Sequence, residues 1–209
     1  QVKTGCIFTE FNAPALREIG DGAFYGCVYL KSIDLSGVTT IGKSAFFSCK
    51  SLEKVVLPST LDELKETTFY DCQSLSEINL DGVVSFGLGV FFGASLPETL
   101  VLTKAEHIGE RAFIEKEGAH YIKTVIAPNL KTIGVQAFIQ CKNLTSITAP
   151  KLESIGTLAF AYTALEKLEV SDALSSVEHD LFEGNDAFKT FYAMVDGVEV
   201  YDFESDAIM

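Results

Sequence analysis

Apolar and aromatic residues return along this chain at a nearly constant interval. A phenylalanine recurs every 22 to 25 residues, at Phe24, Phe46, Phe69, Phe91, Phe113, Phe138, Phe160 and Phe182. Five residues before each of them stands another apolar residue, which in six of the eight repeats is followed by glycine. After the phenylalanine comes an apolar triplet at fixed spacing, such as Leu30, Ile33 and Leu35. Self-similarity at this period indicates a repeat array.

The pattern within one repeat predicts its local structure. The last two residues of the triplet alternate with polar residues, which is typical of a short strand buried on one face. Proline or glycine often follows, as at Pro58 and Gly82, and such residues end strands. The glycine after the first apolar residue, such as Gly42, permits a tight corner. Because one coil of about 22 residues cannot bury its apolar face alone, we predict a solenoid.

The predicted solenoid has about eight to nine coils, built mostly from short parallel strands with turns and short helical segments. Its phenylalanine rings should form one continuous buried column. Three extra residues between Phe113 and Phe138, around positions 115–120, predict an exposed bulge at one corner.

The array accounts for almost the whole chain. It begins at about residue 8, where the same spacing is first met, and its last triplet ends at Ala193. Asp196 and Gly197 lie between two short apolar runs, a strong signal for a two-residue hairpin. We therefore expect a hairpin at about 191–203 that covers the edge of the last strand. The prediction is a single domain over residues 1–209, with the array at about 8–193 and no linker.

The charge balance excludes some classes of partner. The chain has 29 acidic and 16 basic side chains, a formal net charge of −13, which argues against a general binder of nucleic acids or anionic membranes. Twelve acids and two bases lie in residues 165–209, so this segment carries −10. Such an acidic end keeps an array soluble, and we expect a monomer.

The terminal acids also carry an alternative role. Asp202, Glu204 and Asp206 would share one face of an extended strand and could hold calcium, although a solvated tail is the favoured interpretation. No apolar run reaches the roughly 18 residues of a membrane-spanning helix. The first residues include neither an initiator Met nor a secretory signal, so we expect a fragment or a processed form, with no membrane insertion.

The cysteines show no sign of a metal site. Cys27, Cys49 and Cys72 occupy the same position in successive coils, where parallel side chains have poor geometry for a disulfide. We expect them to be free, buried and apolar in character. Cys6 lies outside the repeat and is expected to be the most reactive thiol. The chain has no Cys-x-x-Cys pair, and we predict no metal.

The three histidines, His107, His120 and His179, have no spacing that would bring them together or place them beside an activated nucleophile. We therefore predict no cofactor and no catalytic residue. An enzyme would have to use His120 or Cys6.

The segment Ile41–Leu52, I-G-K-S-A-F-F-S-C-K-S-L, closely resembles the IGxxAFxxCxxL core of the BspA-type leucine-rich repeats, and Ile133 to Leu144 matches it again. The resemblance covers residues 8–193, although Ala94, Lys116, Thr163 and Asn185 replace the motif's cysteine. It implies a right-handed leucine-rich repeat solenoid that is secreted or displayed on a cell surface. Members of the family studied as adhesins bind extracellular-matrix or plasma proteins, or mediate contact between cells.

The outward side of the predicted strands is the candidate binding surface. If the triplets point inward, the outward row consists of Asn12, Asp34, Val56, Asn79, Val101, Ile126, Thr148, Glu169 and Tyr192. Val56, Val101 and Ile126 are apolar where a solvated sheet would be polar, and a contiguous apolar patch marks a partner site. We predict a non-enzymatic, adhesin-type interaction module for a protein or glycan partner. The alternative is a passive spacer within a larger surface protein.

Overall fold

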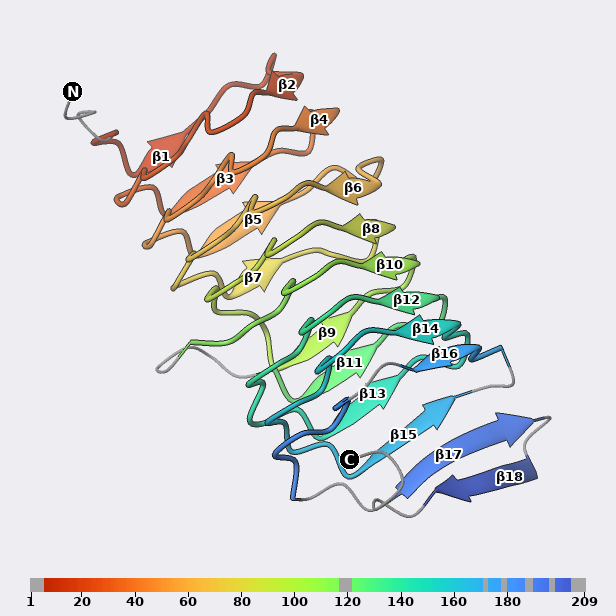
Figure 1. The fold of residues 1–209 in the computed structure, drawn as a ribbon. Coiled ribbons are helices and arrows are strands. Elements are labelled where there is room, and N and C mark those ends of the chain that lie inside the picture. Colours follow the sequence, from red (N-terminus) through yellow and green to blue (C-terminus); the bar gives the residue numbers. More distant parts are fainter. Residues whose placement is uncertain are drawn as a thin grey trace.

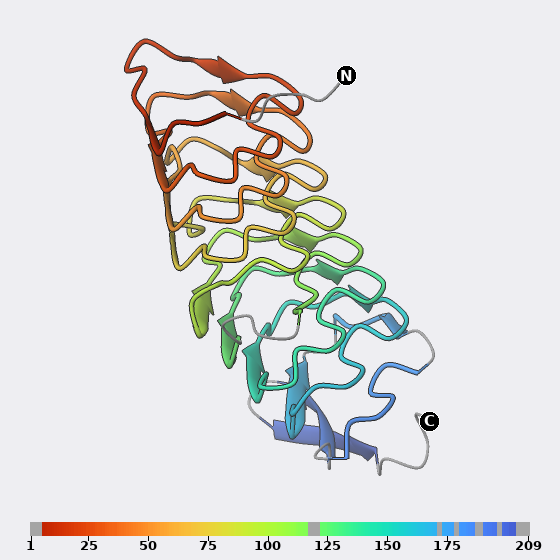
Figure 2. The same ribbon diagram turned by 90° about the vertical axis from the view of Figure 1, so that its left-hand side faces the viewer.

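The computed structural model describes residues 6–116, 122–170, 173–177, 180–186, 190–195 and 198–203. These residues form 18 short strands joined by turns, and they contain no helix, so the expected helical segments are turns. The coils stack into an elongated solenoid, with the first strand, β1 (Glu10–Phe11), and the last strand, β18 (Val198–Phe203), at opposite ends of the stack (Figures 1 and 2). The predicted solenoid of parallel strands is therefore confirmed.

Two ladders of strands run along the solenoid (Figure 1). The predicted strands form the first, which we call ladder A, and all its neighbours within a sheet pair in parallel. Ladder A consists of β1 (Glu10–Phe11), β3 (Ser32–Asp34), β5 (Lys54–Val56), β7 (Glu77–Ile78), β9 (Thr99–Val101), β11 (Thr124–Ile126), β13 (Ser146–Thr148), β15 (Lys167–Val170) and β17 (Thr190–Val195). It is interrupted between β7 and β9, which belong to different sheets.

The second ladder, ladder B, lies where the sequence had predicted only a corner. Its two-residue strands end at the apolar residue five before each phenylalanine. Ladder B consists of β2 (Glu18–Ile19), β4 (Thr40–Ile41), β6 (Glu63–Leu64), β8 (Ser85–Phe86), β10 (His107–Ile108), β12 (Thr132–Ile133), β14 (Ser154–Ile155) and β16 (Ser176–Val177). These strands also pair in parallel, with a break between β4 and β6.

The phenylalanine column fills the space between the ladders. Successive rings from Phe24 to Phe182 lie 5.1 to 6.0 Å apart between centroids and are nearly parallel, with interplanar angles of 21° or less. Phe46, Phe69 and Phe138 have no solvent exposure. The predicted continuous column is confirmed, and its contacts are repeated at every coil.

The glycine that follows six of the eight ladder B strands has a different role from the one predicted. A Cβ on Gly134 would lie 2.6 Å from the Glu110 nitrogen and 2.7 Å from the Gly109 carbonyl carbon, in the backbone of the preceding coil. Gly134 does not have a left-handed backbone, so it serves close approach between coils rather than a corner. Gly20, in the first coil, would place its Cβ more than 4 Å from any neighbour.

The tight corners lie instead two residues before and two residues after each core phenylalanine. These positions have a left-handed backbone in almost every repeat, at Gly22, Gly26, Ser44, Ser48, Thr67, Asp71, Gly89, Gly93, Arg111, Gln136, Gln140, Leu158, Tyr162, Asp180 and Gly184. Because only five of these residues are glycine, no residue type marks the corner in the sequence. Glu115, two residues after Phe113, does not share this conformation.

Different features close the two ends of the stack. At the C-terminal end, β18 (Val198–Phe203) pairs antiparallel with β17, which confirms the hairpin cap. Its predicted turn residues, Asp196 and Gly197, lie outside the described residues. At the N-terminal end, Cys6 forms a disulfide with Cys27 of the next coil.

Candidate functional site

The outward row of ladder A is exposed, but it is not one continuous surface. Val101, Ile126 and Thr148 are neighbours across β9, β11 and β13, and 47% of Val101 and 38% of Ile126 is exposed. Glu169 and Tyr192 continue the register in β15 and β17, although their side chains lie outside the described part of the chain.

The other apolar member of the row does not join this group. Val56 is half-buried and pairs with Asp34 in the separate sheet that ends at β7. Val56 therefore does not lie beside Val101 and Ile126, because the ladder is interrupted between β7 and β9. Val101 and Ile126 remain, and we call these two adjacent residues the β9/β11 patch.

Two polar members of the row serve the fold. The carboxamide of Asn79 accepts a hydrogen bond from the Leu57 N–H at 2.7 Å and donates one to the Leu57 carbonyl at 3.0 Å. Asp34 accepts a hydrogen bond from the Ser36 N–H at 2.9 Å, which lowers the pKa of Asp34. Since both side chains are occupied by backbone groups of this chain, they hold a coil and a turn in place.

Polar groups border the β9/β11 patch. Thr99 and Thr124 stand two residues before Val101 and Ile126 on the same strands, and they pair in register with each other. Beside them the Lys123 ammonium lies 2.9 Å from the Glu98 carboxylate, with both side chains more than half exposed. Such an exposed ion pair adds little stability. An apolar centre with a polar border is the usual arrangement of a protein docking surface.

A second surface feature, which the sequence did not predict, is a column of stacked rings, of which Tyr25 is exposed and the other three are half-buried. It consists of Tyr25, Phe47, Tyr70 and Phe92, each directly after a core phenylalanine. Their centroids lie 4.5 to 4.7 Å apart, with interplanar angles of 6° or less, and 51% of Tyr25 is exposed. An aromatic pair repeated in four consecutive coils is the signal that could have found this column.

Lys116 lies at the end of the aromatic column. Its ammonium is 5.5 Å from the Tyr70 ring centroid and 5.6 Å from the Phe92 ring centroid, within the range of a cation–π contact with each ring. It also contacts the Asp71 carboxylate at 2.7 Å. Burial opposes ionisation of Asp71, but hydrogen bonds from Lys116 and Gln73 outweigh it and lower the pKa of Asp71. Because the rings of the column stack face to face, they present their edges to the outside. Ring edges suit apolar contact more than the stacking of a sugar on a ring face.

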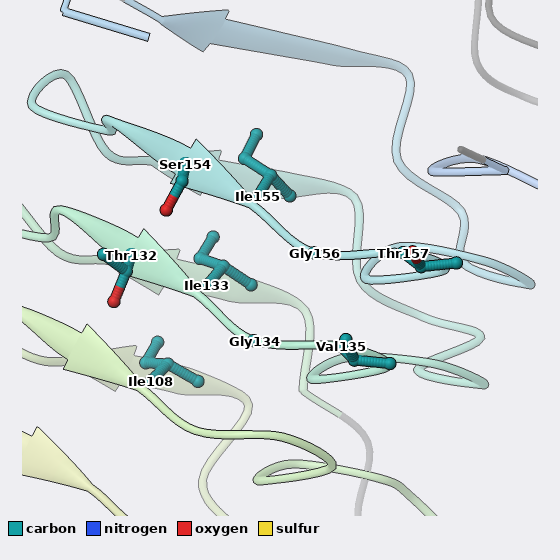
Figure 3. A pocket seen from close by; sticks show the side chains of 9 residues that line it. All are labelled: Ile108, Thr132, Ile133, Gly134, Val135, Ser154, Ile155, Gly156 and Thr157. Atoms are coloured by element: carbon teal, nitrogen blue, oxygen red, sulfur yellow. The ribbon is translucent and has the colours of Figure 1, made fainter. Parts of the chain in front are cut away.

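Ladder B carries a shallow depression of about 490 Å³ (Figure 3). It is lined by the ends of three neighbouring strands and the residues after them, namely Ile108, Thr132, Ile133, Gly134, Val135, Ser154, Ile155, Gly156 and Thr157. These residues supply hydroxyls, aliphatic groups and backbone, and none of them is an acid, a base or a thiol. The depression therefore offers surface for contact but no acid–base chemistry of its own.

An imidazole lies at the edge of this depression. The Nδ1 of His107 is 3.0 Å from the Thr132 hydroxyl, and its Nε2 is 4.0 Å from the Glu106 carboxylate. Glu106 instead accepts a hydrogen bond from the Lys131 ammonium at 2.6 Å, which lowers the pKa of Glu106. The ring is exposed, and no hydrogen bond joins its Nε2 to Glu106. A histidine that activates a hydroxyl needs such a bond to orient the ring, so His107 and Thr132 do not have that arrangement.

The structure corrects two of the cysteine predictions. Cys6, expected to be the most reactive thiol, and Cys27, expected to be free, are joined in a disulfide. Cys6 lies 21 residues before Cys27, about one coil, and the two Cα atoms are 5.0 Å apart, so the two thiols can meet across neighbouring coils.

The three cysteines that remain free are buried, as predicted. Cys49, Cys72 and Cys141 each donate a hydrogen bond of 3.1 to 3.2 Å to the carbonyl of the core phenylalanine in the preceding coil. Burial raises the pKa of these thiols, to about 12 for Cys49. They are therefore structural donors rather than nucleophiles.

The other candidate residues can be placed only in part. Within the described residues, no group of three or more His, Cys, Asp or Glu side chains could hold a metal ion. Of the possible calcium ligands, Asp202 lies in β18, while Glu204 and Asp206 lie outside the described residues, as do His120 and His179. In the part of the chain that the structure describes, no helix has the length and apolarity needed to cross a membrane.

The repeat, the phenylalanine column and the two parallel ladders agree with a comparison against known families. The model of the BspA type leucine rich repeat region matches residues 4–120 and 117–205, with six copies. The chain belongs to this family. Leucine-rich repeat solenoids are typically non-enzymatic and generally act as protein-interaction modules.

Solved leucine-rich repeat proteins share the fold of this family member. A protein from Bacteroides ovatus is 24% identical with a TM-score of 0.61, over 87% of this chain and 54% of the other. One from T. pallidum is 26% identical with a TM-score of 0.58, over 70% of this chain and 69% of the other. A leucine rich cell surface protein from Faecalibacterium prausnitzii is 24% identical with a TM-score of 0.57, over 91% of this chain and 47% of the other.

The chain thus spans about half the length of the first and third of these proteins. No curated protein matches it.

Proposed function

We propose that this chain is the docking module of a cell-surface protein, with an adhesin-type role, and that it binds a protein partner on ladder A. The observation that carries the proposal is the β9/β11 patch, where Val101 and Ile126 lie side by side and exposed on a parallel sheet. A solvated strand surface favours polar residues, and adjacent exposed apolar side chains mark contact sites.

Two further observations support a place outside the cell. Disulfides form and persist in oxidising compartments, and Cys6 is joined to Cys27. The F. prausnitzii protein with the same fold is described as a cell surface protein. We therefore place the domain on a cell surface or in the extracellular space, with an extracellular-matrix, plasma or cell-surface protein as its partner.

The test is a binding experiment on immobilised extracellular-matrix and plasma proteins. The double variant Val101→Thr and Ile126→Thr keeps the β-branched shape that strands favour but replaces apolar groups with hydroxyls. The matched control is Val135→Thr, which changes a side chain of similar exposure, 39%, beside ladder B. Loss of two contacts at the centre of an interface should weaken binding by about 10-fold or more, with the control unchanged.

The same experiment separates the alternatives. Equal affinity of the double variant and the wild type would contradict docking on the patch. If Tyr25→Ala or Tyr70→Ala reduced binding instead, the aromatic column would be the docking surface. A wild-type domain that binds none of the proteins would favour the passive spacer.

A further inference from the structure

A carboxyl group lies in the protein interior beside the proposed docking strand. Only 6% of Glu115 is exposed, and it stands two residues after the core Phe113. Its Oε1 accepts a hydrogen bond from the Ile122 N–H at 2.6 Å. Its Oε2 is buried and has no hydrogen-bond partner among the residues that the structure describes. The three-residue insertion predicts an exposed bulge around positions 115–120, and this prediction is wrong for Glu115.

The partner of Glu115 leads directly into strand β11. Ile122 is buried and stands two residues before Thr124, where β11 begins. The next two amides, of Lys123 and Thr124, both donate to the Glu98 carbonyl of the preceding coil. Glu115 therefore holds the first amide of the segment that ends at Ile126, one half of the β9/β11 patch.

Few charged or titratable groups face this carboxyl. Among the described residues, the thiol of Cys141 on the next coil interacts electrostatically with Glu115. That thiol donates its hydrogen bond to the Phe113 carbonyl. The ammonium of Lys116 contacts Asp71 instead. No described cation forms an ion pair with Glu115, and Glu117 and His120 lie outside the described residues. An ionised Glu115 would thus be a buried charge with one hydrogen bond, an unfavourable arrangement.

We propose that Glu115 is a proton-dependent anchor for strand β11, which holds the strand when protonated and releases its start when ionised. This makes the docking face sensitive to pH in the neutral range. The consequence for binding rests on the proposed function, whereas the anchor itself does not.

The direction of the effect follows from the burial. Burial raises the pKa of Glu115 from 4.5 to about 7, against the opposing effect of the Ile122 hydrogen bond. In the closed state the start of β11 is held and Glu115 is buried, whereas in the open state the carboxyl is in water. Because the pKa of the carboxyl is higher in the closed state, protonation stabilises that state, and it does so fully below the pKa of the open state. That stabilisation is lost as the pH rises through about 7.

The test is hydrogen exchange at the amides of residues 122–126, corrected for the intrinsic pH dependence of exchange. Between pH 5 and pH 8 the opening constant of these amides should rise by roughly 70-fold. Glu115→Gln, which keeps an acceptor for Ile122, should remove most of this rise. Glu98→Gln, which removes an exposed carboxylate from the residue before β9, should leave this rise intact. A rise that is the same in Glu115→Gln and wild type would overturn the proposal.

A second measurement keeps the test independent of the variants. The carboxyl carbon resonance of Glu115 in the wild-type domain should titrate near pH 7, and a midpoint near 4.5 would overturn the anchor. If the resonance and the exchange behave as expected but affinity for the immobilised proteins does not change with pH, the docking face lies elsewhere and the anchor stands.

Discussion

The glycines of ladder B allow a sharp test of how closely the coils pack. We predict that Gly134→Ala destabilises the domain, while Gly20→Ala does not. Both glycines follow a ladder B strand and neither has a left-handed backbone. They differ in their neighbours, because a Cβ at Gly134 would lie 2.6 Å from the Glu110 nitrogen and a Cβ at Gly20 meets nothing within 4 Å.

The size of the effect follows from this distance. Ordinary contact begins near 3.4 Å, so the two coils must separate by roughly 0.8 Å to admit the methyl group. The neighbour is backbone that is hydrogen-bonded into the ladder and cannot rotate away. Forcing extra volume into such a site costs about 1–3 kcal/mol, which lowers the melting temperature of a chain of this size by about 2–12 °C.

The matched control, Gly20→Ala, should raise the stability of the domain rather than lower it. Gly20→Ala restricts the unfolded chain without a clash, which stabilises a protein by about 0.4–1 kcal/mol. Thermal unfolding followed by circular dichroism compares the two variants with the wild type. If Gly134→Ala melts at the same temperature as Gly20→Ala, the close approach of the coils does not explain the glycine, and a role in local backbone freedom would have to replace it.

Two further predictions concern the corners and the disulfide. Gln140 is exposed and has a φ of 65°, so Gln140→Gly should stabilise the domain by about 0.5–1 kcal/mol in chemical denaturation, whereas Gln140→Val should destabilise it; the reverse order would contradict strain at this corner. The Cys6–Cys27 disulfide closes a loop with a sequence separation of 21, so Cys6→Ser should lower stability by about 3 kcal/mol. Reductant should lower the stability of the wild type by the same amount and leave that of Cys6→Ser unchanged. If reductant did not change the stability of the wild type, the disulfide would not contribute to stability.

Much of the architecture could be predicted from local spacing. Residues at equal intervals take equivalent places in stacked coils, so the recurrence of residues such as Phe46 and Phe138 was enough to predict the buried column. The strands of ladder A follow from alternation, as at Ile33 between exposed or half-buried neighbours. Ladder B was missed because a two-residue strand such as Thr132–Ile133 is too short to show any alternation.

The candidate site was less accessible to the same reasoning. The outward row was placed correctly in register, but the interruption between β7 and β9 separates Val56 from Val101. Nothing in the spacing of Asn79 shows that its carboxamide binds the backbone of Leu57, since that contact joins residues 22 apart. The disulfide was likewise not predicted, because cysteines about one coil apart, as Cys6 and Cys27 are, were expected to point in parallel and stay free.

The periodic order of side chains is enough to specify a stacked solenoid with an aromatic interior and a closing hairpin. Each coil has the same apolar face, which it cannot bury alone, and the neighbouring coils bury it. Coil-to-coil distances, the interruption of a ladder and the solvent access of a single side chain depend on atoms contributed by several coils at once. For that reason only the folded arrangement shows that Val101 and Ile126 stand alone as an apolar pair, and that Glu115, at an apparently exposed insertion, lies buried against the strand that carries one of them.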